Sequence, residues 1–307
     1  MRAITYDTYG SADVLQLTEQ PEPHPGPDSV VVRVRAASVN PVDWKIRQGY
    51  LDGLIDARFP VVPGWDVAGV VEKVGLDTPE YQVGDEVYGY VRKDVVQGGT
   101  FAELVAAPVR TLAPKPSLLS FTEAAAVPLA GLTAFQTIER SGVREGQTVL
   151  VHAAAGGVGA FAVQLAVARG ARVIGTASEA NHAYLRGLGA EPVTYGDGLA
   201  DRVRALAPRG VDVALDYVGG ESVTASADVL AEGGVITSIA DPAAATDHGG
   251  IYAWVRPSTA DLTALGALFD EGVLRVDVAE TFDLADAAAA HRASESGHVR
   301  GKVVVTV

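Results

Sequence analysis

The second half of the chain alternates short apolar runs with segments of helical length. The apolar runs are TVLVHA (148–153), ARVIGTA (171–177), EPVTY (191–195), VDVALDY (211–217) and GGVITSI (233–239). Each run has the length of one strand, and the segment between two runs has room for a helix. Since parallel strands are joined by crossover helices, this alternation predicts a doubly wound parallel sheet with helices on its faces.

The first 115 residues follow a different pattern. Short β-rich pieces occur at 30–37, 67–74, 86–90 and 101–106. Segments rich in proline and glycine separate them, which predicts an irregular, mostly antiparallel, barrel-like domain. We expect the junction between the two domains at APKPS (113–117), and we expect the terminal strand RGKVVVTV (300–307) to rejoin the first domain's sheet.

Composition argues against several classes of site and partner. The chain has no cysteine, which excludes disulfides, thiolate catalysis and cysteine-bound zinc, and none of its six histidines lies four residues from another. We therefore expect no metal. The formal net charge of −14 repels phosphate backbones, so we expect no nucleic-acid partner. Residues 1–20 are too polar for a signal peptide, and no apolar run reaches the roughly 18 residues of a membrane span, so we expect a soluble, cytoplasmic protein without a membrane partner.

The first apolar run leads into a glycine-rich turn and then regains helical spacing at once. Ala153, Gly156 and Gly159 form A-x-x-G-x-x-G, the dinucleotide fingerprint with alanine at its first position. A small residue at 153 allows a tight exit from the strand, Gly156 lets backbone N–H groups approach a diphosphate, and Gly159 lets the helix pack on the sheet. The alternative is a tight turn with no ligand. Because a series of strand-helix units follows, we expect a bound dinucleotide.

The end of the second apolar run bears on the choice between NAD and NADP. An NAD site expects an acidic residue about 20 residues after the glycine turn, where it accepts hydrogen bonds from the ribose. This run ends in Thr176, Ala177 and Ser178, so no carboxylate stands at its tip. We therefore expect NADP(H), although Glu179 would come into range if the strand ended later.

Motifs along almost the whole chain resemble one family. They are SVNPVDWKIRQG (38–49), PVVPGWDVAGVVEKVG (60–75), VGDEVYG (83–89), GGTFAELV (98–105), AAAVPLAGLTAF (124–135), HAAAGGVGAFAVQLA (152–166), DVALDYVGG (212–220) and FDLADAAAAHRASESGHVRGKVVV (282–305). Together they are similar to the zinc-independent NADPH:quinone oxidoreductases, the zeta-crystallin-like family of the medium-chain dehydrogenase/reductase superfamily.

The resemblance implies a domain organisation. It implies a GroES-like β-rich substrate domain at 1–115, a Rossmann NADP-binding domain at 116–255 and a C-terminal segment at 256–307 that completes the first domain. It also implies a homodimer joined through the Rossmann sheets, with VITSI (235–239) and the neighbouring strand at the joining edge.

The family pattern also bears on metal. Zinc-using relatives carry a cysteine where this chain has Asn40, and Gly-His-Glu where it has Gly64, Trp65 and Asp66. Both metal positions are thus lost, in agreement with the absence of cysteine.

Three residues are the candidates for catalysis. Asn40 resembles the asparagine that lies near the nicotinamide, and its alternative is a helix N-cap. Lys45 matches a lysine that bonds a substrate carbonyl or the nicotinamide ribose, and its alternative is a solvated surface lysine. Thr133 resembles a threonine that contacts the nicotinamide, and its alternative is a helix residue bonded to its own backbone.

The resemblance also implies a cofactor set and a substrate set. The cofactor set is Asn40, Thr133, Ala155, Gly156, Gly157, Val158, Gly159, Thr176, Ser178, His182, Tyr195, Ile239 and Ala240. Within it, Tyr195 resembles a tyrosine that contacts the 2′-phosphate, and His182 stands where relatives carry a phosphate-binding lysine. The substrate set is Tyr50, Tyr252 and Trp254, of which the last two would look the same as core aromatics.

Two further polar residues sit at strand ends. We expect His152 to be a satisfied, buried imidazole. Asp216 either buttresses the loop beside the cofactor or forms the turn before Gly219.

The implied reaction is hydride transfer from NADPH to a quinone or an α,β-unsaturated carbonyl. Without a metal to polarise a carbonyl, an acceptor that spreads charge over its own π system fits better than a simple alcohol or ketone. Water is the expected proton source, with Tyr50 or Tyr88 as the side-chain candidates. Two alternatives stay open: a double-bond reductase that does not use quinones, and a non-catalytic NADPH-binding protein.

Overall fold

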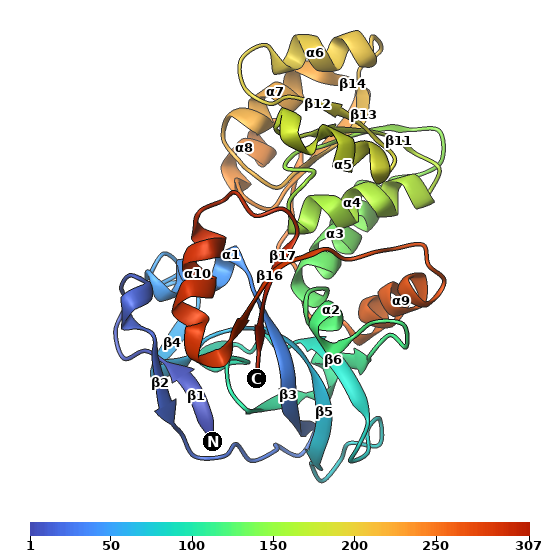
Figure 1. Cartoon of the computed structure of the whole chain (residues 1–307). Coiled ribbons are helices and arrows are strands. Elements are labelled where there is room, and N and C mark those ends of the chain that lie inside the picture. The colour runs from blue at the N-terminus through green and yellow to red at the C-terminus, as the bar shows by residue number, and fades with distance from the viewer. The chain divides into compact units, whose positions relative to one another are not determined.

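The computed structural model describes residues 1–307, except for the side chain of residue 244. The chain forms two compact units (Figure 1). Residues 1–132, 256–272 and 276–307 make up the first unit, and residues 133–255 and 273–275 make up the second. By its contacts, the segment 116–132 therefore belongs to the first unit, and the domain limits expected from the sequence stay a prediction.

The first unit is built on a seven-stranded sheet with the order β16-β17-β3-β5-β6-β9, in which β8 also pairs with β3. Its strands are β3 (Ser29–Val39), β5 (Asp66–Val74), β6 (Glu86–Tyr90), β8 (Leu104–Pro108), β9 (Leu112–Pro114), β16 (Val278–Asp283) and β17 (Lys302–Thr306). Two small sheets complete the unit, and they pair β1 (Arg2–Thr5) with β2 (Gln16–Glu19) and β4 (Asp56–Val62) with β7 (Val95–Gly98). The predicted return of the C-terminal strand is confirmed, because β17 pairs antiparallel with β3.

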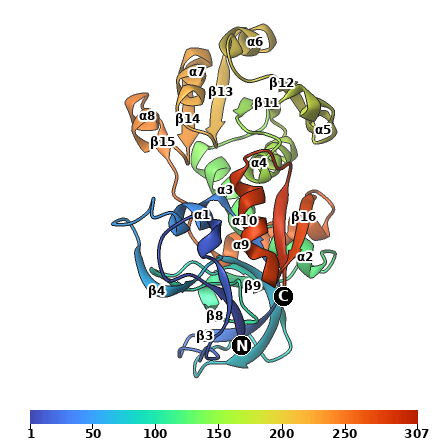
Figure 2. The same cartoon turned by 60° about the vertical axis from the view of Figure 1, so that its left-hand side comes forward.

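Short helices cover this sheet. They are α1 (Pro41–Arg47), α2 (Phe121–Ala125), α9 (Thr259–Asp270), α10 (Ala287–Glu295) and the 3-10 turns η1 (Ala12–Val14), η2 (Val109–Thr111) and η4 (Leu284–Asp286). Helix α10 lies beside β16 and β17 (Figure 2), and its Ala287 and Ala290 join valines of β3, β5 and β17 in one buried cluster. Small helix residues allow this close approach, and burial of the valines is the main stabilising contribution.

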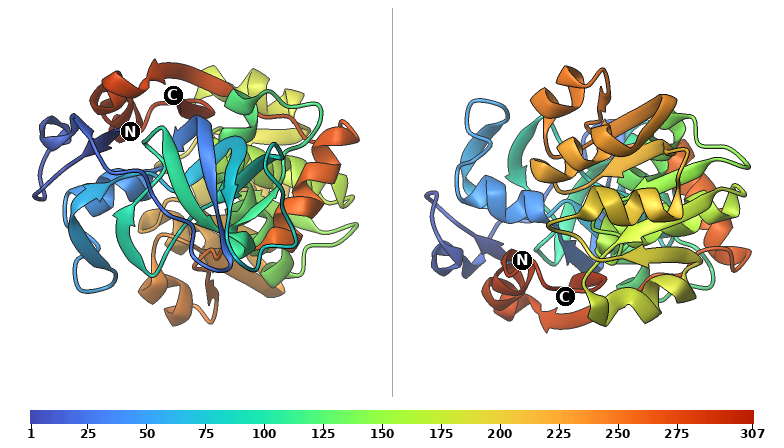
Figure 3. Two further views of the ribbon diagram at one scale, coloured as in Figure 1. Left: turned by 90° about the horizontal axis from the view of Figure 1, so that it is seen from below. Right: turned by 90° about the horizontal axis from the view of Figure 1, so that it is seen from above.

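The second unit is a six-stranded parallel sheet with the order β12-β11-β10-β13-β14-β15. The strands are β10 (Thr148–Val151), β11 (Arg172–Thr176), β12 (Ala190–Val193), β13 (Val211–Asp216), β14 (Leu230–Ser238) and β15 (Ile251–Tyr252). The helices are α3 (Pro128–Ser141, which begins in the first unit), α4 (Gly157–Ala168), η3 (Glu179–Asn181), α5 (His182–Gly187), α6 (Leu199–Leu206), α7 (Glu221–Val229) and α8 (Pro242–Asp247). Figure 3 shows helices on both sides of this sheet, as the alternation of strands and helices predicts.

The strand order explains where ligands bind in such a sheet. Strand β10 lies between β11 and β13, so the chain leaves it first in one direction and later in the other. The crevice at this reversal, at the carboxyl ends of the strands, is the general ligand site of open α/β sheets. Among the described residues, no helix combines the length and the apolar composition that crossing a bilayer requires.

Candidate functional site

The turn after β10 has the geometry that the glycine spacing predicts. Ala153 adopts a φ of 50°, the left-handed region in which a residue other than glycine is uncommon. A Cβ on Gly159 would stand 2.2 Å from the Ala153 carbonyl oxygen, so only glycine fits where α4 crosses the turn. Gly156 precedes the helix with φ −78° and ψ 174°, and a Cβ there would meet the Ala153 oxygen at 3.3 Å. Two of the three positions are therefore set by the fold, whereas a side chain at Gly156 would be tight but would need only a small shift of the Ala153 carbonyl.

The start of α4 is suited to an anion. The first N–H groups of a helix have no acceptor within the helix, and the helix dipole favours negative charge at this end. Helix α4 is twelve residues long and begins at Gly157, directly after the turn. The residues at this position fit the diphosphate of a dinucleotide, because α4 begins at the carboxyl edge of the sheet and Gly156 brings no side chain in front of its first N–H groups.

Strand β11 ends at Thr176, as the sequence predicts, so no carboxylate stands at its tip. The Thr176 hydroxyl accepts a hydrogen bond from the Ala153 amide at 3.2 Å and its carbonyl accepts from the Ala154 amide at 3.0 Å. Thr176 therefore holds the turn after β10 in place, a role that the sequence did not reveal.

The residues expected around a 2′-phosphate lie on the segments that follow β11 and β12. Ser178 accepts a hydrogen bond from Asn181, and His182 lies 3.5 Å from the Thr194 hydroxyl. Tyr195 is 61% exposed. The structure thus brings His182 and the segment 194–195 together, while Tyr195 remains open to solvent.

Arg202 on α6 fixes the loop that presents Tyr195. Its guanidinium donates to the carbonyl oxygens of residues 194, 195, 196 and 197 over 2.8 to 3.3 Å. Carbonyl acceptors leave the charge of an arginine uncompensated, so Arg202 adds positive potential to the loop.

The loop after β14 is tied to the end of β13. Asp216 is fully buried, and it accepts hydrogen bonds from the Gly219 amide and from the hydroxyls of Ser222 and Ser238, the last two at 2.5 Å. The Ser238 hydroxyl in turn accepts from the Ala240 amide at 3.1 Å, and Ile239 donates its amide to the Asp216 carbonyl. Asp216 therefore forms the turn before Gly219 and also supports the loop at 239–240, and the place of that loop beside the cofactor stays a prediction.

His152 is a satisfied core residue, as predicted. It is buried, and its Nε2 lies 2.8 Å from the Ser226 hydroxyl. Burial lowers the pKa of His152 to about 4, so the imidazole is neutral at physiological pH and has no place in the chemistry of the site.

In the first unit, Asn40 belongs to a buried polar cluster. Its backbone amide donates to Asp43 at 2.7 Å, its side-chain amide donates to Asp66 at 2.8 Å, and its Oδ1 accepts from the ammonium of Lys302. Ser38 also donates to Asp66, at 2.8 Å. The cluster, formed by Ser38, Asn40, Asp43, Asp66 and Lys302, gathers where β3 ends and where β5 and β17 begin.

Lys302 is the member of this cluster that the sequence did not reveal. It is 5% exposed, and its ammonium also donates to the Val39 carbonyl at 3.1 Å. Burial lowers the pKa of Lys302, burial raises the pKa of Asp66, and each of the two charges favours the charged form of the other. The predicted pairing of the C-terminal strand with the first domain was the signal, because that pairing sets Lys302 beside the end of β3.

The cluster does not fit a zinc ion. Trp65 offers no ligand atom, and the Asn40 oxygen faces an ammonium group. Among the described residues, no group of three or more histidine, cysteine, aspartate or glutamate side chains is arranged to hold a metal. The cluster instead holds a lysine beside two carboxyl groups, so its positive charge comes from a side chain.

Asp43 should make stability depend on pH. Burial, with the Asp66 charge as a smaller cause, raises the pKa of Asp43 to about 7. A raised folded-state pKa stabilises the fold at low pH, and this stabilisation is lost as the pH rises toward 7. In Asp43→Asn, the side-chain oxygen can still accept from the Asn40 amide, but it cannot ionise. We therefore expect the unfolding free energy of this variant not to fall over this pH range on account of residue 43. The difference in unfolding free energy between wild type and variant should change by about 1.4 kcal/mol per pH unit between about pH 5 and 7.

Urea unfolding of both proteins at pH 5, 6, 7 and 8 measures that difference. Parallel pH profiles for wild type and variant would show that Asp43 is ionised in the folded protein throughout.

The remaining predicted catalytic and substrate residues lie in both units and differ in exposure. Lys45 is exposed, with its ammonium 5.6 Å from the Trp44 ring centroid, and Tyr50 is 68% exposed. Asn40 and Lys45 belong to the first unit, whereas Thr133, buried within α3, begins the second. Tyr252 is half-buried and Trp254 exposed at the end of the second unit. The roles expected for these six residues stay predictions.

Tyr88 is not a proton donor. It is fully buried, and its hydroxyl donates to the Leu262 carbonyl at 2.6 Å. Its proton is therefore committed to a structural hydrogen bond, and burial raises the pKa of the hydroxyl.

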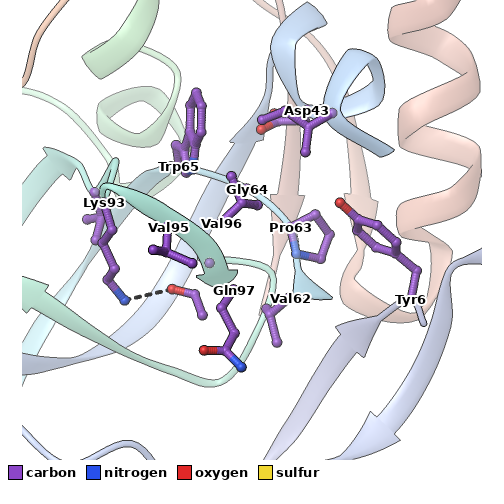
Figure 4. Close-up of a pocket in the computed structure, with 14 residues that line it drawn as sticks. Tyr6, Asp43, Val62, Pro63, Gly64, Trp65, Lys93, Val95, Val96 and Gln97 are labelled. Carbon is purple, nitrogen blue, oxygen red and sulfur yellow. Dashed lines mark hydrogen bonds between the residues drawn. The ribbon is translucent and has the colours of Figure 1, made fainter. Parts of the chain in front are cut away.

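A pocket opens in the first unit between α1, the segment 62–65 and the segment 91–99 (Figure 4). Its enclosed space is about 10 Å³, which is room for about one water molecule. Ile46, Val62, Pro63, Trp65 and Val96 form its apolar walls, and its polar side chains are Tyr6, Asp43, Lys93 and Gln97. The Lys93 ammonium donates to the Gly98 carbonyl at 2.8 Å, and burial lowers its pKa to about 8.

Two known domain families match parts of the chain. The alcohol dehydrogenase GroES-like domain matches residues 26–117, and the zinc-binding dehydrogenase domain matches residues 188–305. The chain is 36% identical over 316 residues to 2-methylene-furan-3-one reductase of Solanum lycopersicum, an alignment that covers 99% of this chain and 79% of the relative. It is also 36% identical to the chloroplastic NADPH-dependent alkenal/one oxidoreductase of Arabidopsis thaliana, with coverage of 99% and 79%.

Solved structures agree. The quinone oxidoreductase from Coxiella burnetii superposes with a TM-score of 0.90 at 36% identity, over 100% of this chain and 99% of that one. This likeness extends over both units and includes the strand that returns from the C-terminus. The chain belongs to the zinc-independent quinone oxidoreductase family of the medium-chain dehydrogenase/reductase superfamily.

Proposed function

We propose that this protein is an NADPH-dependent reductase that transfers hydride to a quinone or to an α,β-unsaturated carbonyl without zinc. The turn at 153–159 supports the proposal, because its left-handed Ala153 and its close packing at Gly159 place the start of α4, where the first N–H groups have no acceptor within the helix, at the carboxyl end of β10. The printed names of the relatives, which include alkenal/one and quinone oxidoreductases, support the same class of acceptor.

In this proposal, the residues of the protein bind NADPH and orient its nicotinamide. Gly156 and the first turn of α4 hold the diphosphate, and Ser178, His182, Tyr195 and Arg202 are the candidates for the 2′-phosphate. NADPH supplies the hydride when it is bound. Asn40, whose amide is fixed by Asp66 and Lys302, is the candidate for the nicotinamide, together with Lys45 and Thr133. Water delivers the proton that completes the reduction.

Oxidation of NADPH, followed by its absorbance, tests the function. A panel of 1,4-benzoquinone, menadione, 2-cyclohexen-1-one and trans-2-hexenal should include acceptors that are turned over. Rates with quinones alone identify a quinone reductase, and rates with enones alone identify a double-bond reductase. Saturable binding of NADPH with no turnover on any acceptor would favour the non-catalytic binding protein and would contradict the proposal.

A chelator provides a second test. We expect incubation with EDTA followed by buffer exchange to leave the rate unchanged, because the cluster around Asn40 and Lys302 offers a metal no ligand set. Loss of turnover that added Zn²⁺ restores would contradict the zinc-independent mechanism.

Replacement of Arg202 should reduce the preference for NADPH. Arg202→Ala frees the loop at 194–197 and removes its positive potential, so we expect the Kd for NADPH to rise about 10-fold, the size of one charged hydrogen-bonding contribution, while the Kd for NADH changes little. Arg204→Ala on the same helix is the matched control, because Arg204 bonds Asp201 and the Asp228 carbonyl. Fluorescence titration with both nucleotides measures the ratio, and an equal loss for NADH would assign Arg202 a general structural role.

Two further expectations belong to this proposal. The dimer expected through the second unit's sheet would use β15 as the outer strand, because β14 pairs with β13 on one side and with β15 on the other. Sedimentation velocity tests the dimer. The cytoplasmic location stays a prediction.

A further inference from the structure

Lys93 is a half-buried amine in the wall of the first unit's pocket. It lies between β6 and β7, and its neighbours Gln97 and Gly98 are exposed. Of the described residues, only the Gly98 carbonyl accepts a hydrogen bond from its ammonium group, at 2.8 Å (Figure 4). The nitrogen is therefore held next to solvent by one neutral partner.

Such surroundings favour the neutral form of the amine. An ammonium group has three N–H donors to satisfy, whereas a neutral amine can give one N–H to the Gly98 carbonyl and keep its lone pair free. Burial lowers the pKa of Lys93 to about 8, and no charge in the pocket or beside it in the chain, such as Asp43 or Asp94, contributes to this shift. Desolvation of this kind makes a lysine nucleophilic.

The other amines of the chain lie in different surroundings. Carboxylates pair with three of them: the Met1 amine with Glu19 at 3.4 Å, Lys73 with Glu22 at 2.9 Å and Lys115 with Glu86 at 3.2 Å. Lys302 is enclosed in the cluster around Asn40, and Lys45 is exposed to water. The chain has no cysteine whose thiol could compete for an electrophile. Lys93 is thus the amine that is partly desolvated, reachable from solvent and not paired with a carboxylate.

We propose that Lys93 is the amine of this chain that α,β-unsaturated aldehydes modify, by conjugate addition. The class of electrophile rests on the proposed function, whose acceptors include such compounds. The neutral nitrogen forms a C–N bond at the β-carbon, the C=C π bond breaks, and its electron pair moves to the carbonyl oxygen as an enolate. The nitrogen then loses a proton to water and the α-carbon gains one from water. The sum is addition of N–H across the double bond, and it needs no oxidant or reductant.

Labelling with trans-2-hexenal in the absence of NADPH tests this assignment. Borohydride reduction preserves the adducts, and mass spectrometry then locates them. Cleavage after glutamate separates the five lysines, because each falls in its own peptide: 20–72, 73–80, 87–103, 104–123 and 296–307. At pH 7 a lysine whose pKa is about 8 has on the order of 100-fold more neutral amine than an ordinary one, but a weaker base is a weaker nucleophile. We therefore expect Lys93 to be labelled about 10-fold faster than Lys45.

The pH profile and unfolding show whether burial is the cause. The labelling rate of Lys93 should be half-maximal near pH 8 and level off above it, whereas the rate of an ordinary lysine still rises above pH 9. In denaturing urea, where burial is lost, Lys93 should lose its advantage over Lys45. Lys93→Arg, which keeps a donor for the Gly98 carbonyl, should lose the label from peptide 87–103 and keep the urea midpoint. Faster labelling of another amine, or a Lys93 rate that keeps rising above pH 9, would overturn the assignment.

NADPH separates this inference from the proposed function. If the protein reduces hexenal, an excess of NADPH should consume the electrophile and lower the labelling of Lys93 and Lys45 in the same proportion. Labelling that prefers Lys93 and does not fall with NADPH would keep this inference and count against hexenal as an acceptor. Labelling that falls with NADPH but does not prefer Lys93 would support the proposed function and overturn this inference.

Discussion

Gly159→Ala should unfold the second unit or destabilise it severely. The new Cβ would lie 2.2 Å from the Ala153 carbonyl oxygen and 2.7 Å from the Ala154 Cα, and both are backbone atoms that no side-chain rotation can move aside. The start of α4 would have to leave β10. We expect the free energy of unfolding to fall by about 3 kcal/mol or more, at the upper end for overpacking. Urea unfolding followed by circular dichroism measures the loss.

Gly156→Ala is the matched control for that substitution. Its Cβ would meet the same oxygen at 3.3 Å, and its φ of −78° suits any residue, so the fold should persist with a loss below about 1 kcal/mol. NADPH binding should nevertheless weaken at least 10-fold, because a methyl group would stand where backbone N–H groups approach the diphosphate. A Gly156→Ala variant that binds NADPH as the wild type does would exclude the turn as the diphosphate site.

Arg47→Ala should produce the second large loss of stability. Arg47 is fully buried at the end of α1, and its guanidinium donates to the Gly10 carbonyl at 3.1 Å, to His291 at 3.0 Å and to Glu295 at 2.5 Å. It thus joins α1 to α10, elements some 250 positions apart in the chain. Burial beside Arg47 lowers the pKa of His291 to about 3, so its imidazole accepts the hydrogen bond in neutral form. Breaking a buried charge network by removing one partner costs about 3 to 5 kcal/mol, which is the loss we expect.

Arg292→Ala tests whether the burial of Arg47 is the reason for the large loss of stability expected on its removal. Arg292 on the same helix α10 pairs with Asp13, and both side chains are exposed. Exposed pairs contribute little in water, so the urea midpoint should not move. Equal losses for the two arginines would show that α10 is held by its surface charges and not by the buried network.

The regular parts of the fold could be predicted because each depends on local pattern. The five apolar runs from TVLVHA to GGVITSI became β10 to β14, and the helix expected after the glycine turn is α4. The short edge strand β15 has only two residues, too few for any periodicity to detect. Strands β1, β4, β7 and β16 were also missed, but for another reason: their pairing partners, and not their composition, decide that they are strands.

The residues of the candidate site also differ in whether local sequence pattern could predict them. Residues within a motif, such as Ala153, Gly156 and Gly159, could be found from spacing alone. Spacing alone could not identify Lys302, because it acquires its role from Asn40 through the pairing of β17 with β3. Burial changed the interpretation of Asn40 and Tyr88 as well, since hydrogen bonds to Asp66 and to the Leu262 carbonyl now account for polar atoms that a sequence leaves free.

Calorimetric titration of the purified protein with NADPH and with NADH tests the central claim most directly, since that claim is that the first N–H groups of α4, which begins at Gly157, bind the diphosphate of a phosphorylated nicotinamide nucleotide. We predict saturable binding with a Kd in the micromolar range for NADPH, weaker binding of NADH, and a weaker NADPH isotherm for Gly156→Ala. Absence of heat with either nucleotide, from wild-type protein shown to be folded by circular dichroism, would contradict it.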